Sequence, residues 1–218
     1  MSEPLWALDA VTLRDLLRKG DIRPQDLLNS GAPRVDAVNP AVNAIVSLDA
    51  EAALAAAQAC DAMSADARAT RPLHGLPFAV KDLALTRGLR TTFGSPLFRD
   101  FVPDEDDLFV TRLRAAGAII IAKTNTPEFG AGANTRNRVY GATGNPFDPR
   151  LTSAGSSGGS AAALAVGMMP LATGSDYGGS LRTPSAYCGI VGFRPSVGVV
   201  PAPDRAAGLI PWGVLGPM

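Results

Sequence analysis

Side chains that can act as a base near neutral pH are scarce in this sequence of 218 residues. It holds three lysines, Lys19, Lys81 and Lys123, and a single histidine, His74. Because general base catalysis near pH 7 most often uses histidine, this scarcity narrows the choice of catalytic side chains. His74 stands beside Gly75, and we interpret it as a turn or packing residue.

The sequence also has no net charge, only two cysteines and no long apolar run. Twenty basic side chains balance twenty acidic ones, which removes any general electrostatic attraction to nucleic acid or to a membrane surface. The two cysteines, Cys60 and Cys188, have no metal-like spacing, so we expect buried reduced thiols and no metal site. The acidic first residues and the short apolar runs are untypical of a signal peptide or a membrane span, and a cytoplasmic protein is expected.

The apolar content is sufficient for a buried core, with 46% hydrophobic and 18% charged residues. Side-chain periodicity predicts helices over residues 11–19, 49–63 and 106–116, and strands over residues 77–80, 118–122 and 171–175. A further helix that opens at Pro24 should break or kink at Gly31 and Pro33. After residue 71 short apolar runs alternate with helices, which predicts an α/β domain around a central sheet.

Two of the lysines stand where predicted strands end. Lys81 follows the strand over residues 77–80, and Lys123 follows the strand over residues 118–122. Open α/β sheets bind ligands at the carboxyl ends of their strands, so both lysines are candidates for a site. The alternative is that each is an ordinary solvated charge at a strand end.

The most informative feature is a pair of glycine- and serine-rich turns, over residues 153–160 and 176–182. One helix and one short strand separate them, so the turns can lie side by side at one edge of the sheet. Each turn also opens a helix, whose free N–H groups and dipole favour a developing negative charge. This arrangement is suited to chemistry that passes through an oxyanion.

Other uses of such turns fit less well. A P-loop needs Gly-Lys-Ser/Thr at the helix start, and no lysine stands there; the glycine spacing of a dinucleotide fold is absent too. A flexible linker would not run directly into the apolar helix over residues 161–166. A nucleophile elbow centred on Ser157 requires a histidine later in the chain, whereas His74 lies upstream and a second histidine would have to follow Met218.

Four motifs together resemble the amidase signature family of serine amidohydrolases. They lie in order at residues 75–82 (GLPFAVKD), 123–129 (KTNTPEF), 155–160 (GSSGGS) and 178–182 (GGSLR), and the resemblance extends from residue 38 to residue 218. It implies an α/β/α sandwich around a central mixed sheet. It also implies an N-terminal helical segment over residues 1–70 that packs on the core, with residues 71–218 as the N-terminal part of the catalytic domain and its C-terminal half absent.

The resemblance assigns a triad. Ser180 falls on the nucleophile of the family, Ser156 on the bridging serine, which follows a cis peptide bond, and Lys81 on the catalytic lysine. In such a triad the bridging serine relays the proton of the nucleophile to a neutral lysine and later returns a proton to the departing amine. Burial disfavours the ammonium form of a lysine, so Lys81 should be almost completely buried.

Further residues are expected to support this triad. The backbone N–H groups of Tyr177, Gly178 and Gly179, with that of Ser180, are the expected oxyanion donors. Tyr177 departs from the family pattern, in which a smaller residue is common. The side chains expected to support the site structurally are Asp176, Arg182 and Lys123.

The resemblance implies hydrolysis of a small-molecule carboxylic amide at its C–N bond through an acyl-enzyme, without a cofactor or metal. No direct nucleic-acid or membrane partner is expected, and a homodimer is left open. Two alternatives stand beside this reading. One is the glutaminase-type A subunit of an aminoacyl-tRNA amidotransferase, although the stretch over residues 181–189 is more similar to the hydrolases. The other is an inactive truncated fragment, because the family domain is about twice as long.

Overall fold

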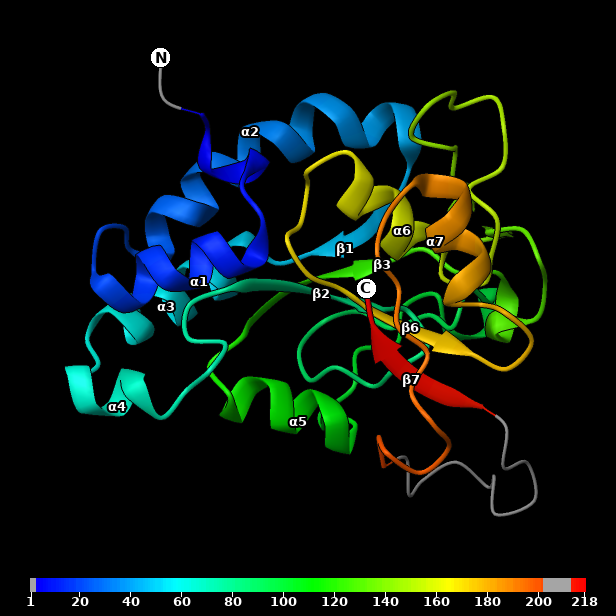
Figure 1. The fold of residues 1–218 in the computed structure, drawn as a ribbon. Coiled ribbons are helices and arrows are strands. Elements are labelled where there is room, and N and C mark those ends of the chain that lie inside the picture. Colours follow the sequence, from blue (N-terminus) through cyan, green and yellow to red (C-terminus); the bar gives the residue numbers. More distant parts are fainter. Residues whose placement is uncertain (1–2, 202–212) are drawn as a thin grey trace.

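A mixed β-sheet forms the centre of the fold (Figure 1). The structure, a computed structural model, describes residues 3–201 and 213–218. Strand β2 (Pro77–Lys81) runs parallel to β3 (Ile119–Thr124), which pairs antiparallel with β1 (Ile45–Leu48). Strands β6 (Thr173–Asp176) and β7 (Val214–Pro217) form an antiparallel pair, which a parallel bridge from Ala172 to Ala79 joins to β2.

Helices cover both faces of this sheet, so the predicted α/β fold with a central mixed sheet is confirmed (Figure 1). Alternate residues of a strand point to opposite faces, and Phe78 and Val80 pack against α5 whereas Ala79 faces α3 and α6. The helices are α1 (Ala10–Lys19), α2 (Pro24–Val42), α3 (Ala50–Asp61), α4 (Ala65–Ala69), α5 (Leu108–Ala115), α6 (Gly158–Ala165) and α7 (Arg182–Cys188). Short 3-10 turns lie at Leu5–Ala7, Pro96–Phe98 and Glu128–Gly130, and a small hairpin joins β4 (Arg136–Asn137) to β5 (Gly141–Ala142).

Most of the predicted elements are confirmed within a few residues. Helices α1, α3 and α5 and strands β2, β3 and β6 correspond to the six predicted segments, and α1 ends at Gly20 in the left-handed conformation (φ 80°). Cys60 and Cys188 are buried and free, as expected. Strands β1, β4, β5 and β7 and helix α4 were not predicted, because segments of two to five residues carry little periodicity.

Helix α2 corrects one expectation. It runs from Pro24 to Val42 as one helix, so of the predicted break or kink at Gly31 and Pro33 the break is wrong. Pro24 occupies the first turn, where its missing N–H has no intrahelical partner to lose. Pro33 does remove one interior hydrogen bond, but the packing of one helix face outweighs this loss. That face places Leu28, Val35 and Val38 against the core.

Gly31 is a site where a single substitution should stabilise the fold. It lies inside α2, and an added Cβ would meet no heavy atom within 4 Å. We expect Gly31→Ala to raise the free energy of unfolding by about 0.5–1 kcal/mol, because alanine loses less backbone freedom on folding. Urea denaturation would measure the change. Gly20→Ala is the matched control, since its Cβ is equally unobstructed but its φ of 80° should make the substitution destabilising. A loss of stability in Gly31→Ala would contradict the argument.

None of the helices in residues 3–201 and 213–218 combines the length and the apolar character that crossing a bilayer requires.

Candidate active site

Lys81 ends strand β2 and lies inside a group of serine hydroxyls. Its side chain belongs to a residue only 2% exposed, which agrees with the burial that a lysine base would need. The Nζ atom lies within hydrogen-bond distance of three hydroxyl oxygens, at 2.7 Å from Ser156, 2.9 Å from Ser157 and 2.9 Å from Ser175. The backbone N–H of Lys81 donates to Thr173 Oγ1 at 2.9 Å, which ties the end of β2 to β6.

Two local features of the sequence bring these hydroxyls together. Thr173 and Ser175 are alternate residues of β6 and therefore share the face that looks toward β2. The glycine–serine turn leads into α6, and a Cβ at Gly159 would overlap the backbone of Asn125. Glycine there lets the turn approach the end of β3 closely enough for Ser156 to reach Lys81. The Gly155–Ser156 peptide bond is cis, as the resemblance implied.

Ser180 lies half-buried in the second turn, between β6 and α7. The backbone N–H of Ser157 donates to the Ser180 carbonyl oxygen at 3.3 Å, so the two turns lie side by side as predicted. Within the described ranges the Ser180 hydroxyl has no hydrogen-bond partner, and it is not bonded to Ser156. Catalytic hydrogen bonds are often completed only when substrate binds, so the missing bond between Ser180 and Ser156 is compatible with a role of Ser180 as nucleophile.

Asp176 holds the turn that carries Ser180. Its buried carboxylate accepts the N–H groups of Gly179 at 2.8 Å and Leu181 at 3.2 Å. It also pairs with Arg182 Nε at 2.9 Å and Arg194 Nε at 3.3 Å. Burial by itself would raise the pKa of Asp176, but the hydrogen bonds from Arg182 and from the backbone outweigh it and hold this pKa below its usual range. The carboxylate is therefore ionised and links these donors around the turn.

The expected oxyanion donors are placed differently from one another. Tyr177 is 61% exposed and Gly178 is exposed, so both lie on the open side of the turn. Gly179 is buried, and its N–H is directed at Asp176 Oδ1. Of the predicted donors, the Gly179 N–H thus serves the carboxylate in this structure, while residues Tyr177 and Gly178 lie at the surface of the turn.

Several residues of this region were not among the sequence-predicted set. Ser157 and Ser175 contact Lys81, and their signals were adjacency to Ser156 and the alternation along β6. Arg194 pairs with Asp176 from 18 residues further along the chain, and no local pattern indicated it. Lys123, expected near the site, is fully buried and contacts the segment after β2 instead of the three serines.

Comparisons with known proteins match most of the chain. A family model described as Amidase matches residues 26–210. The chain is 42% identical over 196 residues to the A subunit of the glutamyl-tRNA(Gln) amidotransferase of Heliobacterium modesticaldum, a match that covers 90% of this chain and 40% of that protein. It is 41% identical over 211 residues to an acylamidase of Rhodococcus erythropolis, a match that covers 97% of this chain and 44% of that protein. A solved bacterial aryl acylamidase of the amidase signature family matches with a TM-score of 0.89 at 29% identity, over 99% of this chain and 45% of that one.

The chain thus spans less than half the length of these relatives. The matched region nevertheless contains Lys81, Ser156 and Ser180, and both its sequence and its fold agree with the same group of proteins. On this match, the chain belongs to the amidase signature family.

Proposed function

We propose that this chain carries the catalytic triad Ser180–Ser156–Lys81 of an amidase that hydrolyses the C–N bond of a small-molecule carboxylic amide. The observation that carries the proposal is the buried Lys81, bonded at 2.7 Å to Ser156 in a turn that is itself hydrogen-bonded to the turn of Ser180. The acylamidase and aryl acylamidase relatives support the reaction class.

The proposed reaction has two halves. Ser180 Oγ attacks the carbonyl carbon while its proton passes to Ser156, which gives its own proton to Lys81. Backbone N–H groups of Tyr177 and Gly178 stabilise the oxyanion. The C–N bond then breaks as a proton returns through Ser156 to the leaving nitrogen, and an ester on Ser180 remains. Water attacks this ester by the same proton route and releases the carboxylic acid.

The hydrogen bonds around Lys81 are compatible with a neutral amine. The Ser157 hydroxyl donates to the Ser175 carbonyl oxygen at 3.3 Å, so toward Lys81 it acts as an acceptor. The hydroxyl protons of Ser156 and Ser175 can instead point at the lysine nitrogen. A neutral amine donates two hydrogen bonds and accepts one, which this set of three hydroxyls can satisfy.

A serine-reactive fluorophosphonate label with peptide mapping tests the proposal. We expect one equivalent of label on the peptide that contains Ser180, because an activated nucleophile beside oxyanion donors reacts faster than an ordinary serine. Lys81→Ala should slow this labelling strongly, whereas Lys19→Ala, at an exposed lysine, should not. Label on Ser157 would indicate a nucleophile elbow instead, and no label on any serine would refute the triad.

The relatives favour one second candidate, because several of them are A subunits of glutamyl-tRNA(Gln) amidotransferases. In this case the same triad would release ammonia from glutamine for partner subunits. Ammonia release from glutamine, measured with and without added partner subunits, separates the two. Glutaminase activity that appears only with the partners would replace the small-molecule amidase by the amidotransferase assignment.

Activity of the 218-residue chain is itself part of the proposal, since relatives are more than twice as long. Light scattering on the purified chain, combined with an amide hydrolysis assay, tests this point and also whether the chain forms a homodimer. A monodisperse, active species supports a competent enzyme. An aggregated and inactive product supports the reading as a truncated fragment.

A further inference from the structure

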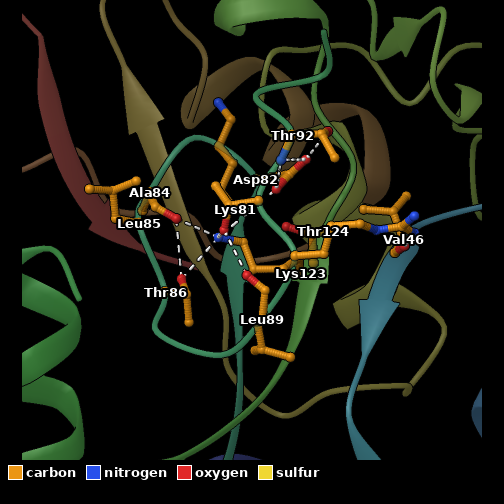
Figure 2. Close-up of polar contacts among 12 residues, drawn as sticks. Val46, Lys81, Asp82, Ala84, Leu85, Thr86, Leu89, Thr92, Lys123 and Thr124 are labelled. Carbon is orange, nitrogen blue, oxygen red and sulfur yellow. Dashed lines mark hydrogen bonds and ion pairs between the residues drawn. The ribbon is translucent and has the colours of Figure 1, made fainter. Parts of the chain in front are cut away.

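Lys123 is a second buried lysine with a different set of partners (Figure 2). It lies in β3, and its Nζ contacts the Ala84 carbonyl oxygen, Thr86 Oγ1 at 2.9 Å and Thr91 Oγ1 at 3.0 Å. Asp82 Oδ1 lies 3.9 Å away. The proposed triad uses none of these groups. All four partners of Lys123 belong to the segment that follows Lys81.

The hydroxyl protons around Lys123 are already in use. The Thr86 hydroxyl donates to the Ala84 carbonyl oxygen at 3.2 Å, and the Thr91 hydroxyl donates to the Leu89 carbonyl oxygen at 3.0 Å. In this arrangement both hydroxyls accept from Lys123, as does the Ala84 carbonyl. Three acceptors match the three N–H bonds of an ammonium, so this set of partners favours the cationic form of Lys123. The partners of Lys81 differ, because the hydroxyls of Ser156 and Ser175 can donate to it.

Asp82 supplies the compensating charge. Its carboxylate accepts the Thr92 N–H at 3.1 Å and the Thr92 hydroxyl at 2.5 Å. Burial raises the pKa of Asp82, while Lys123 and the Thr92 hydrogen bonds oppose that rise. Burial likewise lowers the pKa of Lys123 to about 8, with Asp82 acting in the other direction. When both groups are ionised, each charge of the pair makes the other tolerable in the interior.

The pair adjoins the proposed base. Asp82 directly follows Lys81, and its N–H donates to the Thr124 carbonyl oxygen at 3.0 Å, which fixes the end of β2 against β3. Figure 2 shows that the side chains of Lys81 and Lys123 run in different directions from this point. A negative charge on Asp82 without its partner would favour the ammonium form of Lys81. A positive charge on Lys123 without its partner would favour the neutral amine form of Lys81.

Other charged groups around the pair are already engaged. Asp106 and Asp107, just before α5, accept the N–H groups of Arg87 at 2.7 Å and Leu85 at 3.2 Å. Further charged neighbours in residues 3–201 and 213–218 are Arg114, paired with Asp106 at 3.0 Å, and Arg90, which lies 5.4 Å from the ring centroid of Tyr140. Asp176, beside Ser175, is paired with Arg182 and Arg194. The variants below leave all of them in place.

We propose that Lys123 and Asp82 form a buried, charge-compensating pair that positions Lys81 and keeps it able to give up its proton. Lys123 is thus a positioning residue that acts through Asp82, and the inference rests on the proposed role of Lys81 as a base.

Side-chain NMR of ¹³C-labelled lysine tests this directly, because the chain has only three lysines. Exposed Lys19 is the internal reference, and the signal lost in Lys123→Met assigns Lys123. We expect the titration midpoint of Lys81 to rise by about one pH unit in Lys123→Met and to fall by a similar amount in Asp82→Asn. The double variant Asp82→Asn/Lys123→Met should restore it. Shifts in the same direction, or no shift, would overturn the inference.

The design separates this inference from the proposed function. The NMR titration needs no turnover, so it reports on the pair even if Ser180 is unreactive. The pH dependence of fluorophosphonate labelling at Ser180 should follow the Lys81 midpoint across the same variants. If the midpoints shift as expected and labelling does not follow, the base role of Lys81 is wrong. If Lys123→Met does not fold, Asp82→Asn and the double variant still test the inference. The Lys81 midpoint should fall in Asp82→Asn and return to the wild-type value in the double variant.

Discussion

Replacing Ser180 by alanine is expected to lower the turnover of an amide substrate by about 10⁴- to 10⁶-fold, the size of the loss when a hydrolase nucleophile is removed. The fold should survive, because Ser180 is half-buried and its hydroxyl has no hydrogen-bond partner in the described part of the chain. Steady-state hydrolysis of a chromogenic anilide and a thermal unfolding curve measure the two effects. Ser196→Ala, at an exposed serine, is the matched control. Near-normal turnover in Ser180→Ala would refute the assignment.

A double variant sharpens this prediction. Lys81→Ala alone should also abolish turnover, because Ser180 then has no final acceptor for its proton. Residues that act as one unit are not additive, so Ser180→Ala/Lys81→Ala should be no slower than Ser180→Ala alone. A further loss of activity in the double variant would mean that the two side chains do not belong to one proton route.

Asp176→Ala is expected to cause a large loss of stability, about 1–3 kcal/mol, because it removes a buried acceptor that several N–H groups share. Two arginines and the N–H groups of Gly179 and Leu181 would lose their common acceptor. Urea denaturation at neutral pH measures this loss. The matched control is Asp148→Ala, whose salt bridge of 2.7 Å to the exposed Arg150 should contribute far less, because solvent screens it. Equal losses in the two variants would contradict the argument.

The pKa of Asp176 gives this prediction a pH dependence. Because its folded-state pKa lies below the usual value, the carboxylate stabilises the fold at pH values above about 4. That contribution is lost as the pH falls below about 4 toward the folded-state pKa. The stability difference between the wild-type chain and Asp176→Ala should therefore shrink on acidification, which denaturation curves at several pH values would show.

Local sequence was sufficient for much of the framework. Short apolar runs placed β2 and β3, and the lysine that follows each run lies inside the strand, within one residue of its end. The two glycine–serine turns identified the neighbourhood of Ser156 and Ser180, because such turns impose their backbone shape within a few residues. The continuous α2 was missed, since the packing of one helix face against the core overrides the local effect of Pro33.

Tertiary structure decided the partners of the two buried lysines. By position both follow apolar runs, and the family resemblance alone distinguished Lys81 as the expected base from Lys123 as an expected support. Lys81 meets serines 75, 76 and 94 positions away, whereas Lys123 meets threonines 37 and 32 positions away whose protons are already in use. No local pattern encodes partners at such separations, because they depend on how strands, turns and helices pack together. The sequence determined which residues could do chemistry, and packing determined which hydroxyls and carbonyls surround each buried lysine.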